Sequence, residues 1–315
     1  MMGVADKRKI AIVGTGAVGT TIAYAVMMSG LATELVLVDI DRNKALGEAM
    51  DLVHGLSFVQ PVHIFAGEYE DCRDADIIVY TAGVNQKEGE TRLDLVNKNL
   101  SILKQCLPKI IDKNSQAILL MVANPVDILT YAALRIGGLS PYQVMGSGTV
   151  LDTSRFRYII SRWCHVEARN IHAYVIGEHG DSEVFLWSLS NIAGMQLDDF
   201  CIWRDIPCFN KEEVATRVRH AAYDIIKKKG ATFYAIGLAV QKICATILRD
   251  ENSILTVSGL LEGEYGLSNI CLSLPTLVNR QGRTKILSVP MSSEEKNALL
   301  HSAGVLKKTI QELDL

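Results

Sequence analysis

The stretch Gly14-Thr15-Gly16-Ala17-Val18-Gly19 decides the fold, because it spaces three glycines as Gly-x-Gly-x-x-Gly near the start of a 315-residue chain. It follows the segment 9–13, in which Lys9 precedes four apolar residues that are typical of a strand, and it precedes an apolar segment that is typical of a helix. In this setting the first glycine permits a tight turn, the second lets backbone N–H groups approach a pyrophosphate, and the third lets the helix pack closely on the strand. The helix N-terminus favours the negative charge of phosphates. The stretch therefore predicts a dinucleotide-binding turn.

An acidic residue at the expected distance supports this prediction. Asp39 lies twenty residues beyond Gly19, where a carboxylate can accept hydrogen bonds from both hydroxyls of an adenosine ribose. The same carboxylate repels a 2′-phosphate, and no Arg directly follows it, so we predict NAD rather than NADP as the cofactor. The alternative is a packing turn with a solvated aspartate.

Short β-branched runs alternate with longer helical patterns through the first half of the chain, which is typical of a parallel sheet covered on both faces. An amphipathic helix has apolar residues from Leu93 to Ile110 in alternating steps of three and four. The predicted fold class is α/β with a doubly wound parallel Rossmann sheet. We predict its strands at 9–13, 34–39, 62–65, 76–80, 117–122 and 143–146.

The pattern becomes mixed after about residue 147. A closing helix follows the capping-box spacing from Ser292 to Glu295. We divide the chain into a Rossmann NAD-binding domain at 1–147 and an α+β catalytic and substrate domain at 148–315. In the second domain we predict helices near 151–163 and 211–228 and strands near 171–177, 253–258, 269–273 and 284–288, the last three antiparallel.

Composition argues against several classes of partner. Lys and Arg number 32 against 35 Asp and Glu, which gives a net charge of −3 without a block of like charge, so we expect neither nucleic acid nor an anionic membrane. The apolar segment at 10–33 has to be weighed as a signal peptide or membrane span, but its Gly, Ser and Thr residues divide it into strand, turn and helix.

The seven cysteines include no Cys-x-x-Cys pair. This argues against a disulfide framework or a thiolate zinc site, so we expect no bound metal. The pattern favours a reducing cytoplasm, and each thiol is expected to be an inert packing residue.

Four further motifs identify a family when they are taken together. They are Ala82-Gly83-Val84-Asn85-Gln86-Lys87-Glu88-Gly89-Glu90-Thr91-Arg92-Leu93-Asp94-Leu95-Val96, Ala123-Asn124-Pro125-Val126-Asp127, Gly148-Thr149-Val150-Leu151-Asp152-Thr153-Ser154-Arg155 and Gly177-Glu178-His179-Gly180-Asp181. In this order they resemble the signature of the L-lactate dehydrogenases, above all the bacterial ones, and the resemblance spans nearly the whole chain. It implies a cytoplasmic, homotetrameric, NAD-dependent enzyme of glycolysis and fermentation that interconverts pyruvate and L-lactate.

Reduction of a 2-keto acid requires a hydride, a proton for the developing alkoxide, a donor that polarises the carbonyl and a clamp on the carboxylate. His179 suits the proton role, because imidazole changes charge near neutral pH. Asp152 can accept a hydrogen bond from the other ring nitrogen, which fixes the tautomer and raises the pKa of His179. Outside these motifs, a histidine between glycines is more often an ordinary loop residue.

Two arginines and an asparagine complete the catalytic and substrate-binding set. Arg155 lies three residues after the aspartate in a predicted helix, and its planar guanidinium can hold a carboxylate through two hydrogen bonds. Arg92 ends the polar segment 86–91, which we interpret as a lid that brings a cation to the carbonyl. Asn124 follows the fifth predicted strand and can hydrogen-bond the substrate oxygen, and the resemblance suggests a cis bond before Pro125. Without the resemblance, an exposed helix arginine and a solvated loop are the simpler interpretations.

Gln86 governs the predicted choice of substrate. A malate dehydrogenase of this superfamily is expected to carry Arg at this position to pair with a second carboxylate, whereas Gln leaves that charge unpaired, so pyruvate fits better than oxaloacetate. Thr232 and Ile236 match positions that line the substrate methyl pocket and the nicotinamide face, and the size of that pocket decides whether a branched 2-hydroxy acid is accepted. The non-enzyme alternative is a catalytically silent dinucleotide-binding protein.

The resemblance also assigns the cofactor contacts. They are Gly14, Gly16, Val18, Gly19, Asp39, Lys44, Tyr69, Ala82, Gly83, Val122, Asn124, Ser147 and Ile236.

Arg157 lies two residues after Arg155, so in a helix it points about 200° away and cannot join the same pocket. In bacterial L-lactate dehydrogenases the positions that match Arg157 and His172 bind fructose 1,6-bisphosphate across a two-fold interface. The resemblance therefore implies an allosteric activator site, to which imidazole contributes more charge at acid pH. The alternative is an interface ion pair beside a core histidine.

Overall fold

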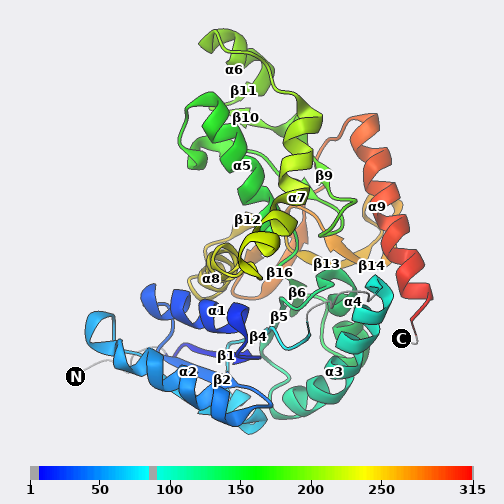
Figure 1. Cartoon of the computed structure of the whole chain (residues 1–315). Helices are drawn as coiled ribbons and strands as arrows, with labels where there is room; N and C mark the ends of the chain where they lie inside the picture. Colours follow the sequence, from blue (N-terminus) through cyan, green and yellow to red (C-terminus); the bar gives the residue numbers. More distant parts are fainter. Residues whose placement is uncertain (1–6, 85–90, 314–315) are drawn as a thin grey trace.

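The computed structural model describes residues 7–84 and 91–313, except for the side chain of Arg92. Within these residues the main sheet has eight strands in the order β14-β13-β6-β5-β4-β1-β2-β3 (Figure 1). The first six strands of the chain run parallel, and the order β3-β2-β1-β4-β5-β6 is that of a dinucleotide-binding sheet, which confirms the predicted fold class. These strands are β1 (Lys9–Val13), β2 (Glu34–Val38), β3 (His63–Gly67), β4 (Ile77–Tyr80), β5 (Ile118–Met121) and β6 (Val144–Gly146).

Helices cover both faces of this sheet, and the residues of β1 show why this strand is buried between them. All five of its residues are buried, because alternate side chains point to opposite faces and both faces are covered. Ile10 and Ile12 pack with side chains of α1 (Ala17–Met28) and α8 (Tyr234–Leu248). Ala11 and Val13 pack on the other face with those of α3 (Arg92–Lys113), α4 (Val126–Gly137) and α9 (Ser293–Gln311).

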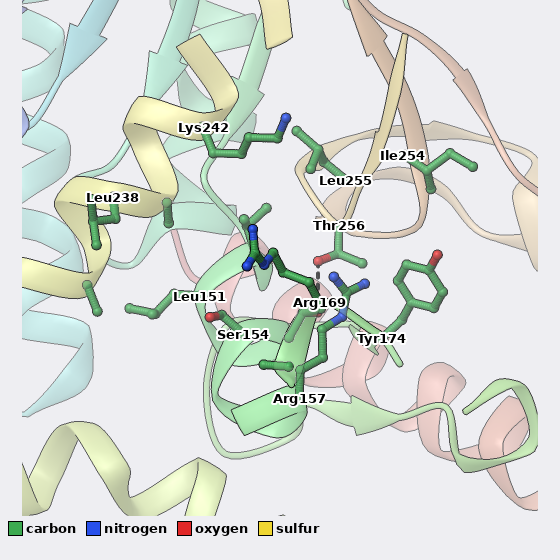
Figure 2. Close-up of a pocket in the computed structure, with 15 residues that line it drawn as sticks. Leu151, Ser154, Arg157, Arg169, Tyr174, Leu238, Lys242, Ile254, Leu255 and Thr256 are labelled. Atoms are coloured by element: carbon green, nitrogen blue, oxygen red, sulfur yellow. Dashed lines mark hydrogen bonds between the residues drawn. The ribbon is translucent and has the colours of Figure 1, made fainter. Parts of the chain in front are cut away.

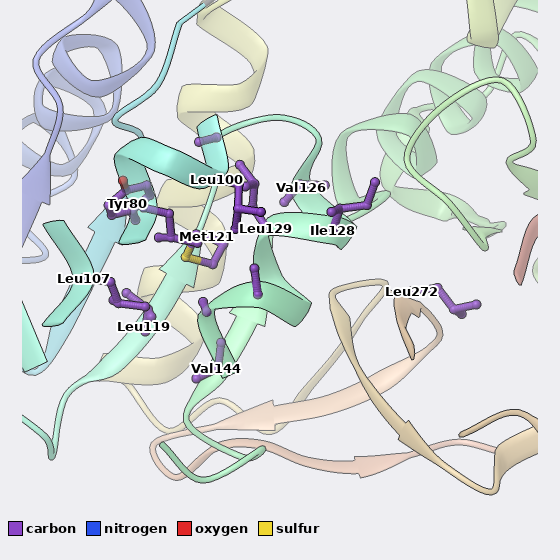
Figure 3. Packing of buried hydrophobic residues seen from close by; sticks show 14 of the residues in the cluster. Tyr80, Leu100, Leu107, Leu119, Met121, Val126, Ile128, Leu129, Val144 and Leu272 are labelled. Atoms are coloured by element: carbon purple, nitrogen blue, oxygen red, sulfur yellow. The ribbon is translucent and has the colours of Figure 1, made fainter. Parts of the chain in front are cut away.

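The larger core lies on the α3 and α4 face. Figure 3 shows Leu100 and Leu107 of α3, Leu119 and Met121 of β5 and Leu129 of α4 gathered there. Truncation of a buried leucine of this kind to alanine typically costs about 2–5 kcal/mol of folding free energy. This core holds the strand ends that carry the site.

The second half of the chain extends the main sheet and adds smaller ones. β13 (Ser258–Glu262) and β14 (Ser268–Ser273) pair antiparallel, and Ser258 of β13 joins Gly146 of β6. The smaller sheets contain β7 (Ile171–His172), β8 (Val175–Ile176), β9 (Val184–Phe185), β10 (Asn191–Ile192), β11 (Met195–Gln196), β12 (Ser253–Leu255), β15 (Thr276–Asn279) and β16 (Gly282–Ile286).

Two predicted strands are each divided in the structure. The segment 253–258 contains β12 and the start of β13, which belong to different sheets, because the carbonyl of Thr256 leaves the ladder and accepts a hydrogen bond from Thr149 N at 3.1 Å. The segment 171–177 likewise contributes β7 and β8 to two sheets. Predicting each as one continuous strand was wrong.

The sequence predicts some of the helices in the second half of the chain and misses others. α5 (Val150–Cys164), α7 (Lys211–Lys229) and the capping box of α9 lie where the sequence predicts them. α6 (Leu197–Arg204) and α8 were not predicted. In the first half of the chain, α2 (Arg42–His54) follows β2. α5, α6 and α7 lie in the upper part of Figure 1 and enclose a separate core that is rich in aromatic side chains. We call this part of the molecule the outer lobe. Cys208 of this lobe is exposed and so departs from the expectation that each cysteine is a packing residue. No helix in the described part of the chain is long and apolar enough to cross a membrane.

Candidate active site

The glycine turn has the geometry that its sequence predicts. Gly14 follows β1 with a φ of +101°, and a Cβ there would lie 2.6 Å from the backbone nitrogen of Ala82. A Cβ at Gly19 would overlap the carbonyl oxygen of Gly14. Both positions therefore require glycine for packing alone, independently of any ligand.

Gly16 differs from these two glycines. It is the N-cap of α1 with a φ of −71°, and a Cβ there would meet no atom within 4 Å. The first turn of α1 contains no acidic residue, and no side chain caps its N–H groups. These free N–H groups and the open space beside them fit a pyrophosphate at the helix N-terminus.

Asp39 follows β2 and is bonded directly to the glycine turn. Its Oδ2 accepts hydrogen bonds from the backbone N of Thr15 at 2.6 Å and from Thr15 Oγ1 at 2.9 Å, while Oδ1 accepts from Asp41 N at 3.0 Å. Burial raises the pKa of Asp39, but these hydrogen bonds outweigh it and hold the pKa below its usual range. The carboxylate is therefore charged and suited to accept ribose hydroxyls. The role of Thr15 was not predicted.

Most of the other predicted cofactor residues lie at the carboxyl edge of the parallel sheet. Ala82 and Gly83 follow β4, Val122 follows β5 and Ser147 follows β6. Ligands bind at this edge in open α/β sheets. Val18 lies in α1, Lys44 in α2 and Ile236 in α8, whereas Tyr69 lies in the short helix η2 (Tyr69–Cys72) and donates its hydroxyl hydrogen to Cys106 Sγ at 3.2 Å.

The side chains of His179 and Arg155 both contact the carboxylate of Asp152. Nδ1 of His179 lies 2.6 Å from Asp152 Oδ2, and Arg155 Nη1 donates to Asp152 Oδ1 at 2.7 Å. The aspartate is 2% exposed, whereas the imidazole keeps 27% of its side-chain surface exposed. α5 carries the acid and the arginine, and His179 follows β8.

The electrostatics of this pair follow from its geometry. Burial lowers the pKa of His179, but the charge of Asp152 and the hydrogen bond to it outweigh burial and raise the pKa to about 9. Burial raises the pKa of Asp152, but His179 and Arg155 together hold it below its usual range. The pair can therefore hold a proton on the imidazole at neutral pH.

Two further buried acids at this centre were missed. Asp127 of α4 accepts hydrogen bonds from the backbone N of His179 at 2.8 Å and from Ser258 Oγ at 2.5 Å, and burial raises its pKa to about 6. Glu183 is 3% exposed, and burial raises its pKa to about 9. Asp127 belongs to the motif Asn124-Pro125-Val126-Asp127, so its place three residues after Asn124 was a signal for it. Glu183 lies four residues after His179, without a comparable signal.

Asn124 lies at the carboxyl edge of β5, and its bond to Pro125 is cis, as the resemblance suggested. Its side chain is exposed, while its backbone carbonyl accepts a hydrogen bond from Asn99 Nδ2 at 2.7 Å. Asn99 also bonds Val84 N at 2.8 Å, so one α3 side chain ties the segments after β4 and β5 together.

The structure describes the three remaining predicted substrate residues to different extents. Gln86 lies outside the described residues, and Arg92 is the first residue of α3, with its side chain also outside them. Thr232 is half-buried just before α8. α8 packs on the glycine-turn helix, since a Cβ at Gly237 would lie 2.7 Å from Thr21 Cγ2.

Arg157 and His172 lie apart from this centre and line different cavities of the single chain. Arg157 donates to the carbonyl of Ala173 at 3.0 Å, stacks over the Tyr174 ring at 5.3 Å and lines a cavity of about 370 Å³ with Arg169 and Lys242 (Figure 2). Burial lowers the pKa of Arg157. His172 is exposed and lines a hollow of about 500 Å³, which Arg169 also borders.

Comparison with known proteins agrees with this geometry. The chain matches the family models described as lactate/malate dehydrogenase, NAD binding domain, over residues 8–146 and lactate/malate dehydrogenase, alpha/beta C-terminal domain, over residues 149–314. It is 52% identical over 314 residues to the L-lactate dehydrogenase of Acetivibrio thermocellus and 52% identical over 309 residues to that of Clostridium perfringens, with 98% of each chain covered. Its fold matches the crystal structure of the minor L-lactate dehydrogenase from Enterococcus mundtii with a TM-score of 0.94 at 40% identity, over 98% of this chain and 99% of that one. This chain therefore belongs to the lactate/malate dehydrogenase family of NAD-dependent oxidoreductases.

Proposed function

We propose that this protein is an L-lactate dehydrogenase that interconverts pyruvate and L-lactate. The observation that carries the proposal is the 2.6 Å contact between His179 and the buried Asp152, in a chain 52% identical to L-lactate dehydrogenases. When NADH is bound it supplies the hydride. The residues of the chain bind the two substrates, orient them and supply the proton. We propose that the boundary between the NAD-binding and catalytic parts lies at 147/148, and the matched family regions 8–146 and 149–314 support this division.

His179 donates the proton in the direction of pyruvate reduction. Asp152 holds Nδ1, so Nε2 is the ring atom that can give its proton to the developing alkoxide. In lactate oxidation the same atom takes the proton back, and Asp152 stabilises the imidazolium that forms. Asp127 fixes the backbone of His179 and thereby positions the ring.

Arg155 binds the carboxylate of the substrate. One N–H group bonds Asp152, which leaves the other donors of the guanidinium for a two-point contact with a carboxylate. Arg92, the first residue of α3, supplies a second cation that polarises the carbonyl, and Asn124 donates a hydrogen bond to the substrate oxygen.

The choice of pyruvate over oxaloacetate depends on Gln86. The test is NADH oxidation with a panel of keto acids, in which we expect pyruvate to give the highest kcat/KM. Gln86→Arg supplies a partner for a second carboxylate, so we expect preference to shift towards oxaloacetate. An unchanged ratio of the two kcat/KM values argues against this role, and a wild-type preference for oxaloacetate or a branched keto acid rejects the proposed substrate.

Fructose 1,6-bisphosphate activates the enzyme at a site that Arg157 and His172 of two chains build together. The Arg157 cavity also contains Arg169 and Lys242, and His172 borders a hollow with Arg169, so the surface between them is rich in phosphate-binding groups. Addition of the bisphosphate should raise activity, measured at both pH 6 and pH 8 with and without the added bisphosphate. Activity that stays flat at both pH values rejects this activation.

The enzyme assembles as a homotetramer. Large apolar side chains are exposed on α2 at Leu46 and Met50, beyond it at Phe58, and on α8 at Tyr234 and Leu238, and such side chains favour association. Sedimentation equilibrium of the purified protein tests this, and a monomer at micromolar concentration rejects it.

A further inference from the structure

The loop that carries His179 contacts the last helix of the chain, α9, which runs beside β9 and β14 (Figure 1). Ser302 of α9 is fully buried, and its Oγ accepts a hydrogen bond from the backbone N of Glu178 at 2.8 Å. The same oxygen lies 3.1 Å from Oγ of Ser182. Ser182 in turn donates to the carboxylate of Glu178. One hydroxyl of α9 therefore contacts the residue before the catalytic ring and a residue shortly after it.

The start of this loop is fitted to the hydroxyl of Ser302. Gly177 has a left-handed φ of +86°, and a Cβ there would lie 2.7 Å from Ser302 Oγ. Gly177 and Ser273 of β14 exchange two backbone hydrogen bonds of 2.9 Å. The loop therefore leaves a fixed point of the sheet and passes directly against Ser302.

A second polar contact fixes α9 along the same segment. Glu295 lies seven residues before Ser302, which is close to two helical turns, so both side chains lie on one face of α9. The buried carboxylate of Glu295 accepts hydrogen bonds from Ser188 N at 2.9 Å and from Ser188 Oγ at 2.6 Å. The place of Ser302 beside the loop is therefore set by contacts outside the catalytic centre.

The backbone around His179 is anchored at two successive N–H groups. The N of His179 donates to Asp127 of α4 at 2.8 Å, and the N of Glu178 donates to Ser302 of α9. The ring itself contacts Asp152 of α5 at 2.6 Å, and such a bond weakens steeply when its geometry changes. A shift of about 1 Å in a reacting group can cost much of its rate. The two backbone anchors therefore determine how well the ring meets its acid.

We propose that Ser302 is a positioning residue for His179, acting through its hydrogen bond to the backbone of Glu178. The inference rests on the proposed function, because it assigns a role within the proton transfer of that reaction. Ser302 bonds the loop on both sides of the ring, so it acts on the orientation of the imidazole and through that on the proton of Nε2. The sequence predicts α9 from its capping box but gives no signal for this contact.

Ser302→Ala removes the hydroxyl to which Glu178 N donates. We expect kcat for the preferred keto acid to fall about tenfold, because the loop can shift and misplace the ring. KM for the keto acid and the affinity for NADH should stay within about twofold, since the carboxylate clamp lies on α5 and the glycine turn follows β1. This split separates a loss of positioning from general damage.

The pH profile is a second readout that a merely structural role would not move. Burial lowers the pKa of His179, and the acidic groups that face the ring, Asp152 of α5, Asp127 of α4 and Glu183 of the loop, raise it to about 9. Ser302→Ala changes none of these groups but moves the ring relative to them. The pH at which activity falls should therefore move from about 9 towards the ordinary histidine value of about 6.5.

A third readout does not depend on turnover. Diethylpyrocarbonate modifies neutral imidazole, and it can reach the ring of His179, which keeps 27% of its side-chain surface exposed. At pH 7.5 the protonated ring of the wild type should react slowly, whereas the ring of Ser302→Ala should react several times faster, as measured by mass spectrometry of the peptide that contains residue 179. This result is the same whichever keto acid the enzyme prefers, so failure of the proposed substrate and failure of the Ser302 role are distinguishable.

Ser190→Ala is the matched control, because Ser190 is also fully buried and donates to the carbonyl of Leu186 at 2.8 Å. It should lower Tm as Ser302→Ala does, while kcat, the pH profile and the modification rate of His179 stay at their wild-type values. The proposal is overturned if Ser302→Ala keeps the wild-type kcat and pH profile. It is equally overturned if the loss of kcat comes with an equal loss of NADH affinity, or if Ser190→Ala shows the same losses.

Ser182→Ala replaces Ser302→Ala if that variant does not fold, because Ser182 is only partly buried. It deletes the hydroxyl beside Ser302 and keeps the acceptor of Glu178 N, so we expect a smaller fall in kcat of about threefold. His179 should again react faster with diethylpyrocarbonate than in the wild type. In that case, a wild-type kcat together with a wild-type modification rate overturns the proposal.

Discussion

The cofactor turn and the catalytic centre are built in opposite ways. The turn is local, since Gly14, Gly16 and Gly19 lie within one strand–turn–helix unit and present backbone N–H groups. The catalytic centre is non-local, since His179 bonds an acid 27 residues away and another 52 residues away. The glycine turn can bind phosphates because its glycines lack side chains, whereas the catalytic centre works through the chemistry of its side chains. Substitutions should therefore separate binding of the dinucleotide from proton transfer.

The largest effect is expected at the catalytic ring. His179→Ala removes the proton donor, so kcat/KM for pyruvate should fall about a thousandfold. The affinity for NADH, measured by fluorescence titration, should stay within about twofold, because the glycine turn does not contact the ring. His301→Ala on the exposed face of α9 is the control. If His179→Ala loses NADH affinity by as large a factor as it loses kcat/KM, the two regions do not act separately.

Asp152→Asn should cost about a hundredfold in kcat/KM at neutral pH, because the imidazolium loses its charge partner. In the wild type, pyruvate reduction needs protonated His179, so activity should stay high below pH 9 and fall as the pH rises through about 9. In the variant this fall should move towards the ordinary histidine value of about 6.5. A pH profile that keeps its position would falsify the assignment of Asp152.

The same ion pair predicts how stability changes with pH. The folded pKa of His179 is raised above the unfolded value of about 6.5, so its contribution is fully present below pH 6.5 and is lost as the pH rises through about 9. The pKa of Asp152 is lowered, so its contribution is lost as the pH falls through that lowered value. Thermal unfolding at pH 6.5 and pH 10 should show the larger wild-type advantage over Asp152→Asn at pH 6.5.

Gly16→Ala tests the local region with a smaller effect. The fold has room for the methyl group, so Tm should hardly change, but the methyl group occupies the space beside the free N–H groups. We expect NADH to bind about tenfold more weakly, or about 1.4 kcal/mol. Gly47→Ala on the exposed face of α2 also has room for a Cβ and should leave NADH binding unchanged. Wild-type affinity in Gly16→Ala means that this face of the turn does not meet the phosphates.

The smallest effect is expected at Glu183. Burial raises its pKa to about 9, so it is uncharged at neutral pH, and Oε1 has no hydrogen-bond partner among the described residues. Glu183→Gln keeps the shape without the titrating proton, so kcat at pH 7 should change by less than about threefold. Above pH 9 the variant should be the more stable, because the wild type then carries a buried carboxylate. A tenfold loss of kcat at pH 7 assigns Glu183 to the catalytic machinery.

Prediction from the sequence succeeded where periodicity and local chemistry agree. The run 9–13 is β1, and its four residues after Lys9 are all apolar, as expected of a strand buried on both faces. α8 was missed because its side chains are mostly apolar, so no polar face marks its helical period. α6 was missed because it is short and follows a turn-rich segment.

The sequence by itself determined the glycine turn, the parallel sheet and the residue types of the catalytic set, because spacing along one strand and one helix sets these features. Only the tertiary structure decided that Asp127 fixes the backbone of His179 and that Arg155 shares the carboxylate of Asp152. Such contacts depend on how distant segments pack, and no local periodicity records the packing of segments that lie far apart in the chain.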